Sequence, residues 1–414
     1  MARRLTLDFL RTETAAGTTL ALAALAGLIV ANSPWRNAYA AFLAAPVPVR
    51  IGGWAETLPV LAWVKDGLMT VFFYLVGLEI KFEALRGELS SPRRLALPVI
   101  AAAGGMIAPA LVYLAVNAGS GGRPQGWPVP VATDIAFALA ALAVAGRGAP
   151  TALRTFLMAL AVADDLGAVV LIATLFTHTL RLSALAGAAA SLGCLALLTL
   201  WRRAPAAFYL IGALAAWAFT LRSGVSPSVA GVAAAMFVPI AARRDGERGM
   251  LERISEALHP WVAYAVLPLF AFCAAGFSLA ALSVRGVLSP VPLGIFAALL
   301  IGKPLGVFSA ARLAVRLRLA HRPSGAGWGE LFAVTVLCGV GFTMSLYLAA
   351  LAFPAAGPTD GAETQAGVRL GVIAGSLASV AVGAWLLRRA AMRRDRARER
   401  PHPHHHRDDL ETGR

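Results

Sequence analysis

Runs of apolar residues that are long enough to cross a bilayer recur along almost the whole chain. A helical span needs about 20 such residues, because the hydrocarbon core is about 30 Å thick. Twelve windows of this kind centre near residues 24, 72, 104, 136, 164, 190, 213, 231, 270, 300, 340 and 378. A backbone in lipid must satisfy its own polar groups, which helices do. We therefore predict an all-α polytopic membrane protein with twelve transmembrane helices.

Composition and charge support this fold class and exclude others. Of the 414 residues, 58% are hydrophobic and only 14% are charged, and the mean hydropathy is +0.70. Soluble domains carry about 25% charged residues, so membrane lipid is the expected partner of the surface. The net charge of +15 does not indicate nucleic acid, because the basic residues lie in short connections between the windows. We expect no cofactor, and packing roles for the three cysteines, Cys194, Cys273 and Cys338.

Arginine is distributed unequally between alternate connections, which predicts the orientation of the chain. A cytoplasmic N-terminus gives that side clusters of basic residues and leaves single residues on the other side. We therefore predict that both termini are cytoplasmic. The cytoplasmic clusters are Arg3, Arg4 and Arg11; Arg86, Arg93 and Arg94; Arg147 and Arg154; Arg202 and Arg203; Arg243, Arg244, Arg248 and Arg253; and Arg312, Arg316, Arg318 and Arg322.

Two segments outside the spans have a predicted form of their own. In the external loop 32–59, the sequences VPVRI and WAETL flank a glycine pair, which predicts a small β-hairpin, with an irregular loop as the alternative. The integral membrane domain covers residues 1–392. The remaining residues, 393–414, are charged and lack apolar runs, so we expect a disordered cytoplasmic tail. Its histidines could hold a metal, but a solvated tail is the preferred interpretation.

Asp164 and Asp165 stand side by side in the apolar stretch FLMALAVADDLGAVVLIATLF. One carboxylate at the centre of a bilayer costs about 2.5–3.5 kcal/mol on insertion scales. Two adjacent carboxylates cost more, because like charges in low dielectric repel and favour a bound proton on at least one of them. Charges kept at this depth usually serve transport or proton transfer. The pair therefore predicts a site where a cation and protons compete for the same oxygens.

Two spans contain helix breaks at membrane depth. In WPVPVATDIAFALA, two prolines prevent regular helix, so Thr133 and Asp134 fall where a half-helix begins. Asp134 would there neutralise the positive end of the helix dipole. In LCGVGFTMSL, Gly339 and Gly341 interrupt the span, and Thr343 follows at the start of a second half-helix. Two interrupted spans in different halves of a chain predict a midplane binding site in an inverted repeat. The alternative for the second span is that its glycines merely permit close packing.

Further charges lie near these elements. Lys303, in AALLIGKPLGVF, lies roughly in mid-span and needs a partner, for which Asp164 or Asp165 is the obvious choice. Asp66 lies near the outer end of the second span, and Glu79 and Glu83 share one face at its inner end. These acids line either a solvated helix end or a vestibule. The inner segment LERISEALHPW could sense pH or simply be charged surface through three residues, Glu252, Glu256 and His259.

The chain resembles the NhaA-type sodium/proton antiporter family. The resemblance rests on VFFYLVGLEIKFE, ATDIAFALA, FLMALAVADDLGA, LHPWVAYAVLPLFAFCAAG, LLIGKPLG and LCGVGFTMSL, in family order and over nearly all of the chain. It implies an inverted-repeat transporter fold of twelve helices, whose fourth and eleventh spans are discontinuous and cross in mid-membrane. It also implies a bacterial inner-membrane protein that is not an enzyme, and a homodimer formed through the external loop 45–58.

The resemblance further implies a role for each candidate residue. Asp165 becomes the main Na+ ligand, and Asp164 alternates between the cation and a salt bridge to Lys303. Thr133 and Asp134 line the ion site. Family members exchange two protons for one Na+ or Li+ and are shut down at acidic pH. The acids and histidine along the access funnels and in the pH response would be Asp66, Glu79, Glu83, Glu252, Glu256 and His259.

Two positions depart from the family pattern, and two other protein classes deserve comparison. Phe82 stands where the family commonly has a basic residue, and Ser226 stands where some members have a histidine linked to pH.

An intramembrane aspartyl protease would need a GxGD motif, which is absent from the sequence. A sodium-coupled organic solute symporter of similar architecture is the alternative, although the spans offer few polar side chains to line a solute pocket.

Overall fold

The computed structural model describes residues 2–51, 54–87, 92–146, 149–177, 180–201, 204–240, 249–354 and 361–398. Regular structure within these ranges is helical, apart from one two-stranded sheet. The elements are α1 (Ala2–Ala31), α2 (Arg36–Ala44), β1 (Pro46–Ile51), β2 (Trp54–Pro59), α3 (Val60–Trp63), α4 (Met69–Leu85), α5 (Pro92–Val116), α6 (Ile135–Ala145), α7 (Thr151–Leu175), α8 (Leu182–Leu200), α9 (Ala206–Ser223), α10 (Pro227–Ala235), α11 (Met250–Trp261), α12 (Leu267–Ala275), α13 (Val284–Val287), α14 (Pro290–Ala297), α15 (Lys303–Arg316), α16 (Trp328–Leu337), α17 (Phe342–Ala352) and α18 (Gly361–Arg398).

Three π-helical turns join pairs of these helices into longer segments. Val64–Leu68 joins α3 to α4, Val262–Val266 joins α11 to α12, and Ala298–Gly302 joins α14 to α15. Within the described ranges, eight helical segments are long and apolar enough to cross a membrane. They are α1, α5, α7, α8, α9, α11 with α12, α14 with α15, and α18. The pair α16 and α17 makes a ninth if it is counted as one span bent by 45°.

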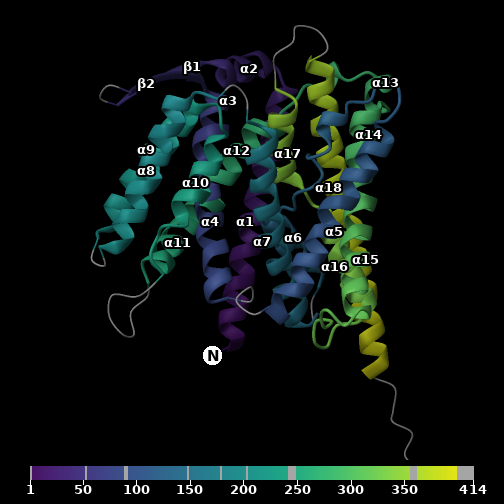
Figure 1. Ribbon diagram of the computed structural model, residues 1–414. Coiled ribbons are helices and arrows are strands. Elements are labelled where there is room, and N and C mark those ends of the chain that lie inside the picture. Colours follow the sequence, from purple (N-terminus) through teal and green to yellow (C-terminus); the bar gives the residue numbers. More distant parts are fainter. Residues whose placement is uncertain are drawn as a thin grey trace, which may run out of the picture.

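The polytopic fold class is therefore confirmed, whereas the number of twelve spans stays a prediction. The three remaining predicted windows, near residues 72, 136 and 231, fall on α4, α6 and α10. These helices have only 17, 11 and 9 residues. Figure 1 shows the helices running side by side, with α8 and α9 along one edge and α5, α14, α15 and α18 along the other. The middle of the bundle holds α7, α4, α1 and α12.

The predicted β-hairpin in the loop 32–59 is confirmed. Strands β1 and β2 pair antiparallel from Pro46 opposite Pro59 to Ile51 opposite Trp54. The hairpin lies across one end of the bundle, and the N-terminus lies at the other end (Figure 1). It is fastened to the bundle by an ion pair between Glu56 and Arg222 of α9. The same loop contains a helix that the sequence analysis did not predict, α2.

Two other predictions need adjustment. Helix α18 continues to Arg398, so the first residues of the segment 393–414 are helical, and residues 399–414 lie outside the described ranges. Cys273 and Cys338 are buried as expected, but the packing role was wrong for Cys194, which is exposed. Cys194 lies on α8, an edge helix whose apolar residues face outward in large part, as expected for contact with lipid.

Candidate functional site

Two interrupted helices meet in the middle of the bundle. Before α6, the chain from Pro124 to Asp134 is mostly without regular helix, and four residues separate α16 from α17. The non-helical segment before α6 is hydrogen-bonded to the one between α16 and α17, because the N–H of Asp134 donates to the carbonyl of Val340 at 2.7 Å. The hydroxyl of Thr133 lies 3.0 Å from the carbonyl oxygen of Cys338. Backbone groups that lost their helical partners thus find new ones across the crossing.

The close approach at this crossing requires glycine. A Cβ on Gly339 would lie 2.3 Å from the carbonyl oxygen of Leu299, in the π-helical turn before α15. No side chain fits at that distance, so the interrupted segment packs directly against the helix that carries Lys303. Helix α15 is held in turn against α5, where a Cβ on Gly306 would lie 2.2 Å from the carbonyl oxygen of Gly104.

The carboxylate of Asp134 caps both half-helices. Its Oδ1 accepts a hydrogen bond from the N–H of Phe137, three residues into α6, at 3.2 Å. Its Oδ2 accepts from the N–H of Thr343 at 3.0 Å and from the Thr343 hydroxyl at 2.5 Å. Anionic groups at helix N-termini are stabilised by the exposed N–H groups and the dipole. Asp134 therefore serves two N-termini at once; the residues alone predicted this for α6, and the family resemblance implied a role at the dipoles of both half-helices.

Lys303 pairs with Asp164 and leaves Asp165 without a cationic partner. The side chains of Lys303 and Asp164 are both 0% exposed, and Lys303 Nζ lies 2.5 Å from Asp164 Oδ2. The same ammonium donates to the carbonyl oxygen of Val131, in the interrupted segment before α6. The Thr133 hydroxyl donates to Asp164 Oδ2 at 2.7 Å. The residues alone left the choice between the two adjacent aspartates open, and the family resemblance implied Asp164; in the structure α15 places Lys303 beside Asp164.

The remaining oxygens of the aspartate pair have no such support. Oδ1 of Asp164 and Oδ1 of Asp165 are both buried and have no hydrogen-bond partner among the described residues. Buried polar atoms are normally paired, so two orphaned carboxylate oxygens on adjacent residues point to a ligand. Within the described ranges, no three Asp, Glu, His or Cys side chains are grouped as a metal site. A cation there would take its remaining oxygens from hydroxyl and carbonyl groups.

A cavity of about 510 Å³ leads from Asp165 toward the end of the bundle opposite the hairpin. Thr133, Asp134, Asp165 and Thr343 line its buried part. Closer to the surface, α4 and α11 supply half-buried or exposed acids and a histidine. These side chains are Glu79, Glu83, Glu252, Glu256 and His259. The structure therefore brings the acids of α4 and the titratable residues of α11, which lie more than 160 residues apart in sequence, into one cavity.

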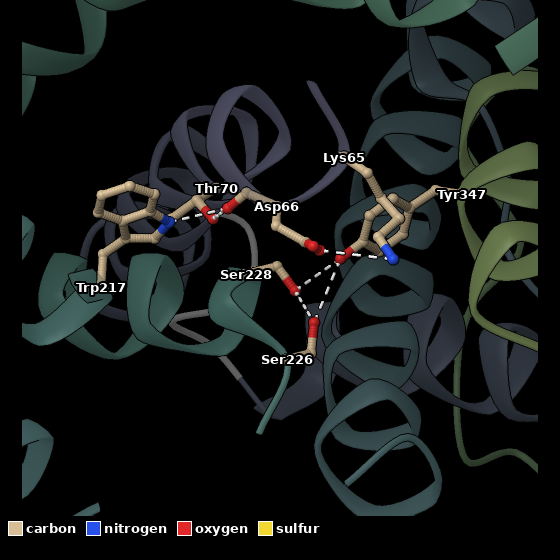
Figure 2. Close-up of polar contacts among 7 residues, drawn as sticks. All are labelled: Lys65, Asp66, Thr70, Trp217, Ser226, Ser228 and Tyr347. Atoms are coloured by element: carbon tan, nitrogen blue, oxygen red, sulfur yellow. Dashed lines mark hydrogen bonds and ion pairs between the residues drawn. The ribbon is translucent and has the colours of Figure 1, made fainter. Parts of the chain in front are cut away.

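Asp66 lies elsewhere. It belongs to the π-helical turn Val64–Leu68, near the hairpin, and it does not line the cavity. Lys65 Nζ is 3.7 Å from its Oδ1. Figure 2 shows it beside Tyr347, Ser226 and Ser228, a polar cluster that the sequence analysis had not assembled. Ser226 had been singled out only for replacing a histidine.

The end of α4 near the cavity mouth also carries Lys81 and Phe82, whose side chains have different surroundings. The Lys81 ammonium donates to the carbonyls of Met236 and Val238 at 2.6 and 2.7 Å. It thereby caps the C-terminal end of α10, where a cation is favourable. Its charge points away from Glu79 and Glu83, as expected from their spacing. Phe82 lines the cavity, so an apolar ring occupies the position that is commonly basic in the family resembled.

Comparisons with known proteins give matches over most of the chain. The family model described as Na+/H+ antiporter 1 matches residues 7–387. A protein of Serratia proteamaculans named "Na(+)/H(+) antiporter NhaA" is 45% identical over 382 residues, covering 92% of this chain and 97% of its own length. Proteins with the same name are 47% identical in Rhodospirillum rubrum, covering 92% and 96%, and 45% identical in Aeromonas hydrophila, covering 94% and 96%.

Proposed function

Because the chain belongs to the Na+/H+ antiporter 1 family, we propose that it exports Na+, or Li+ in its place, in exchange for about two protons that move inward. One observation carries this proposal. Of the two adjacent buried aspartates, Asp164 is held by Lys303 and Thr133, while one oxygen of each has no partner within the part of the chain that the structure describes. Na+ is a hard cation that takes oxygen ligands, and these oxygens can bind it only when they are free of protons.

The proposed exchange follows from the charge of the site. With no cation bound, Asp165 carries a proton, and the Asp164–Lys303 pair carries a second one between its two members. An uncompensated charge in this buried region would be costly. When Na+ enters through the cavity, it binds Asp165 and the unpartnered oxygen of Asp164, and both protons are released. Thr133 supports the ionised form of Asp164 by donating to it. Proton binding from the other side reverses these events and expels Na+.

The same stoichiometry makes transport depend on voltage. Two protons moving in for each Na+ moving out carry one net charge inward per cycle. A membrane potential that is negative inside then adds about 2.3 kcal/mol per 100 mV to the driving force.

We propose a bacterial inner-membrane location with both termini cytoplasmic, which the arginine distribution supports. The cavity then faces the cytoplasm and the hairpin faces outward. In this arrangement α4, α6 and α10 belong to the remaining spans, so that the chain crosses twelve times and the breaks before α6 and α17 cross in mid-membrane. The acids and His259 at the cavity mouth are proposed to mediate the pH response. The paired strands in the loop 45–58 are proposed to join two copies into a homodimer.

Exchange in everted membrane vesicles tests this function. Vesicles prepared from cells that express the protein should release protons from an acidified lumen when Na+ or Li+ is added. The rate of this release should fall toward acidic pH. Vesicles without the protein provide the control. No Na+-dependent proton movement would contradict the proposal. Proton or Na+ movement that requires an organic solute would instead favour a sodium-coupled symporter.

A further inference from the structure

A second polar cluster lies on the hairpin side of the ion site, where α10, α17 and the π-helical turn Val64–Leu68 meet (Figure 2). Its oxygens come from Asp66, Ser226, Ser228 and Tyr347. The three hydroxyl-bearing residues are buried, at 6% exposure or less, whereas the side chain of Asp66 is 17% exposed. The cluster therefore reaches from the interior to a carboxylate that solvent can approach.

The hydroxyl protons of this cluster are fully used among the hydroxyls themselves. Ser226 Oγ and Ser228 Oγ lie 2.9 Å apart, and Tyr347 Oη lies 3.0 Å from Ser228 Oγ and 3.3 Å from Ser226 Oγ. Each hydroxyl has one proton to donate, so a closed ring of three contacts leaves none for Asp66. Lone pairs remain on all three oxygens.

The carboxylate of Asp66 is consequently short of partners. Its side chain points toward the Tyr347 hydroxyl in Figure 2. Among the described residues its ionic partner is Lys65, at 3.7 Å, which is longer than the roughly 2.7–2.9 Å of a charge-assisted hydrogen bond. The backbone of Asp66 is firmly held, because its carbonyl accepts from Thr70 at 2.7 Å and from Trp217 at 2.8 Å. The position of the Asp66 carboxylate is thus fixed, but its oxygens lack a close hydrogen-bond donor among the described residues.

We propose that Asp66, Ser226, Ser228 and Tyr347 form a second, external binding site for the transported monovalent cation. The inference rests on the proposed function. A hard cation takes only oxygen ligands, and the cluster offers one carboxylate and three hydroxyls. The hydroxyl oxygens lie 2.9–3.3 Å apart, close enough to serve as neighbouring ligands of one hard cation.

The location fits a site on the exit path. Tyr347 follows Thr343 by one turn of α17, a rise of about 6 Å, and Thr343 is bonded to Asp134 in the ion site. The Tyr347 ring packs against the buried rings of Phe73 and Phe270, with centroids 5.4 and 6.2 Å away. None of the four residues of the external site lines the cavity, and the side chain of Asp66 keeps 17% of its surface exposed.

Lys65 acts as a competitor in this site. Its side chain is 26% exposed, so the ammonium can leave Asp66 without becoming buried. A cation arriving at Asp66 replaces it, as Na+ replaces Lys303 at Asp164 in the proposed function. Removing Lys65 should therefore strengthen external cation binding, whereas removing Asp66 or the Tyr347 hydroxyl should weaken it. A purely structural role for the cluster predicts no such opposite effects.

Right-side-out vesicles expose the external face and test the site directly. We expect Asp66→Asn and Tyr347→Phe to raise the half-saturating external Na+ concentration about tenfold or more. Lys65→Gln should lower it about two- to fivefold. Tyr74→Phe is the matched control, because Tyr74 lies on α4 outside the cluster and lines an apolar groove. Equal half-saturation in the wild type and all three variants would overturn the site, as would a rise in Lys65→Gln. If the wild type shows no exchange in either vesicle orientation, it is the proposed function that fails.

Binding to the purified protein provides a second measurement that does not depend on transport. In an Asp165→Asn background, we expect saturable binding of ²²Na+ that unlabelled Li+ displaces. Adding Asp66→Asn or Tyr347→Phe should remove it, and adding Tyr74→Phe should not. Thermal unfolding in detergent identifies any variant that has lost its fold. No saturable binding in a folded Asp165→Asn protein, or binding that survives Asp66→Asn, would overturn the external site.

Discussion

Asp134 accepts hydrogen bonds from both the backbone and the hydroxyl of Thr343, a residue 209 positions later in the chain. The contact joins the starts of two half-helices, α6 and α17, that belong to different halves of the sequence. It means that α6 and α17 share one carboxylate that accepts hydrogen bonds from the first turn of each helix. Whatever moves one half-helix must therefore also move or break its contact with the other.

This shared cap predicts a graded loss of stability. Loss of one N-cap costs about 1 kcal/mol, and Asp134→Ala removes the acceptor from two helices, so it should destabilise more than Thr343→Val, which leaves the cap of α6 intact. Thermal unfolding in detergent measures both, and Thr174→Val, on exposed α7 surface, is the control. Equal midpoints for Asp134→Ala and the wild type would show that the cap contributes nothing.

Asp164 and Lys303 should behave as a coupled pair. Removal of either partner leaves a buried charge without compensation, which typically costs 3–5 kcal/mol. We therefore expect Asp164→Asn and Lys303→Ala each to destabilise the protein, and the double variant to be clearly more stable than the sum of the two losses predicts. The measurement is a double-mutant cycle from unfolding midpoints. Simple additivity would mean that the two charges do not interact.

Most residues of this site could be predicted from the sequence, because charged residues are rare within apolar spans. Asp164, Asp165, Thr133, Asp134 and Lys303 were all named from their context, and the structure brings them together. What the sequence could not decide depends on how helices cross. Adjacent aspartates differ only in which side of α7 they face, so the residues alone left the partner of Lys303 open, and only the family resemblance implied Asp164, beside which the structure places it.

Other features had no sequence signal that local reasoning could detect. The three π-helical turns follow no obvious pattern, and one of them fixes Lys303. Asp66 lies on the hairpin side, away from the cavity of Glu79 and Glu83, in line with its predicted place at the opposite end of the same span, but its hydroxyl neighbours were not predicted. Its hydroxyl neighbours come from α10 and α17, more than 150 residues away. The predicted windows near residues 213 and 231 were the hardest to delimit, because only the short sequence LRSGVSPSV separates them.

Transport should depend on voltage. In proteoliposomes with a Na+ gradient, valinomycin and K+ clamp the potential, and removing the opposing potential should speed exchange, because one net charge crosses per cycle. A protonophore control shows that the recorded signal reports protons. A rate that ignores imposed voltage would indicate one-for-one exchange, in which the Asp164–Lys303 pair releases no proton.

Lys81 should support stability rather than ion binding. Its ammonium caps α10 through two carbonyls, and hydrogen bonds to charged groups contribute about 1.5–3 kcal/mol. We expect Lys81→Met to lower the unfolding midpoint while the half-saturating Na+ concentration on the cavity side stays close to that of the wild type. A changed Na+ requirement without a change in unfolding would place Lys81 in the ion path instead.

The most direct test of the ion site is Na+-driven proton flux in everted vesicles that contain Asp165→Asn. This change removes the charge but keeps nearly the same shape, so the protein should insert and unfold normally while exchange is abolished. Glu363→Gln is the matched control, since that carboxylate lies at the start of α18 and bonds to Ser283, far from the cavity; it should exchange at the wild-type rate. Exchange near the wild-type rate by folded Asp165→Asn would contradict the assignment of Asp165 as the main cation ligand.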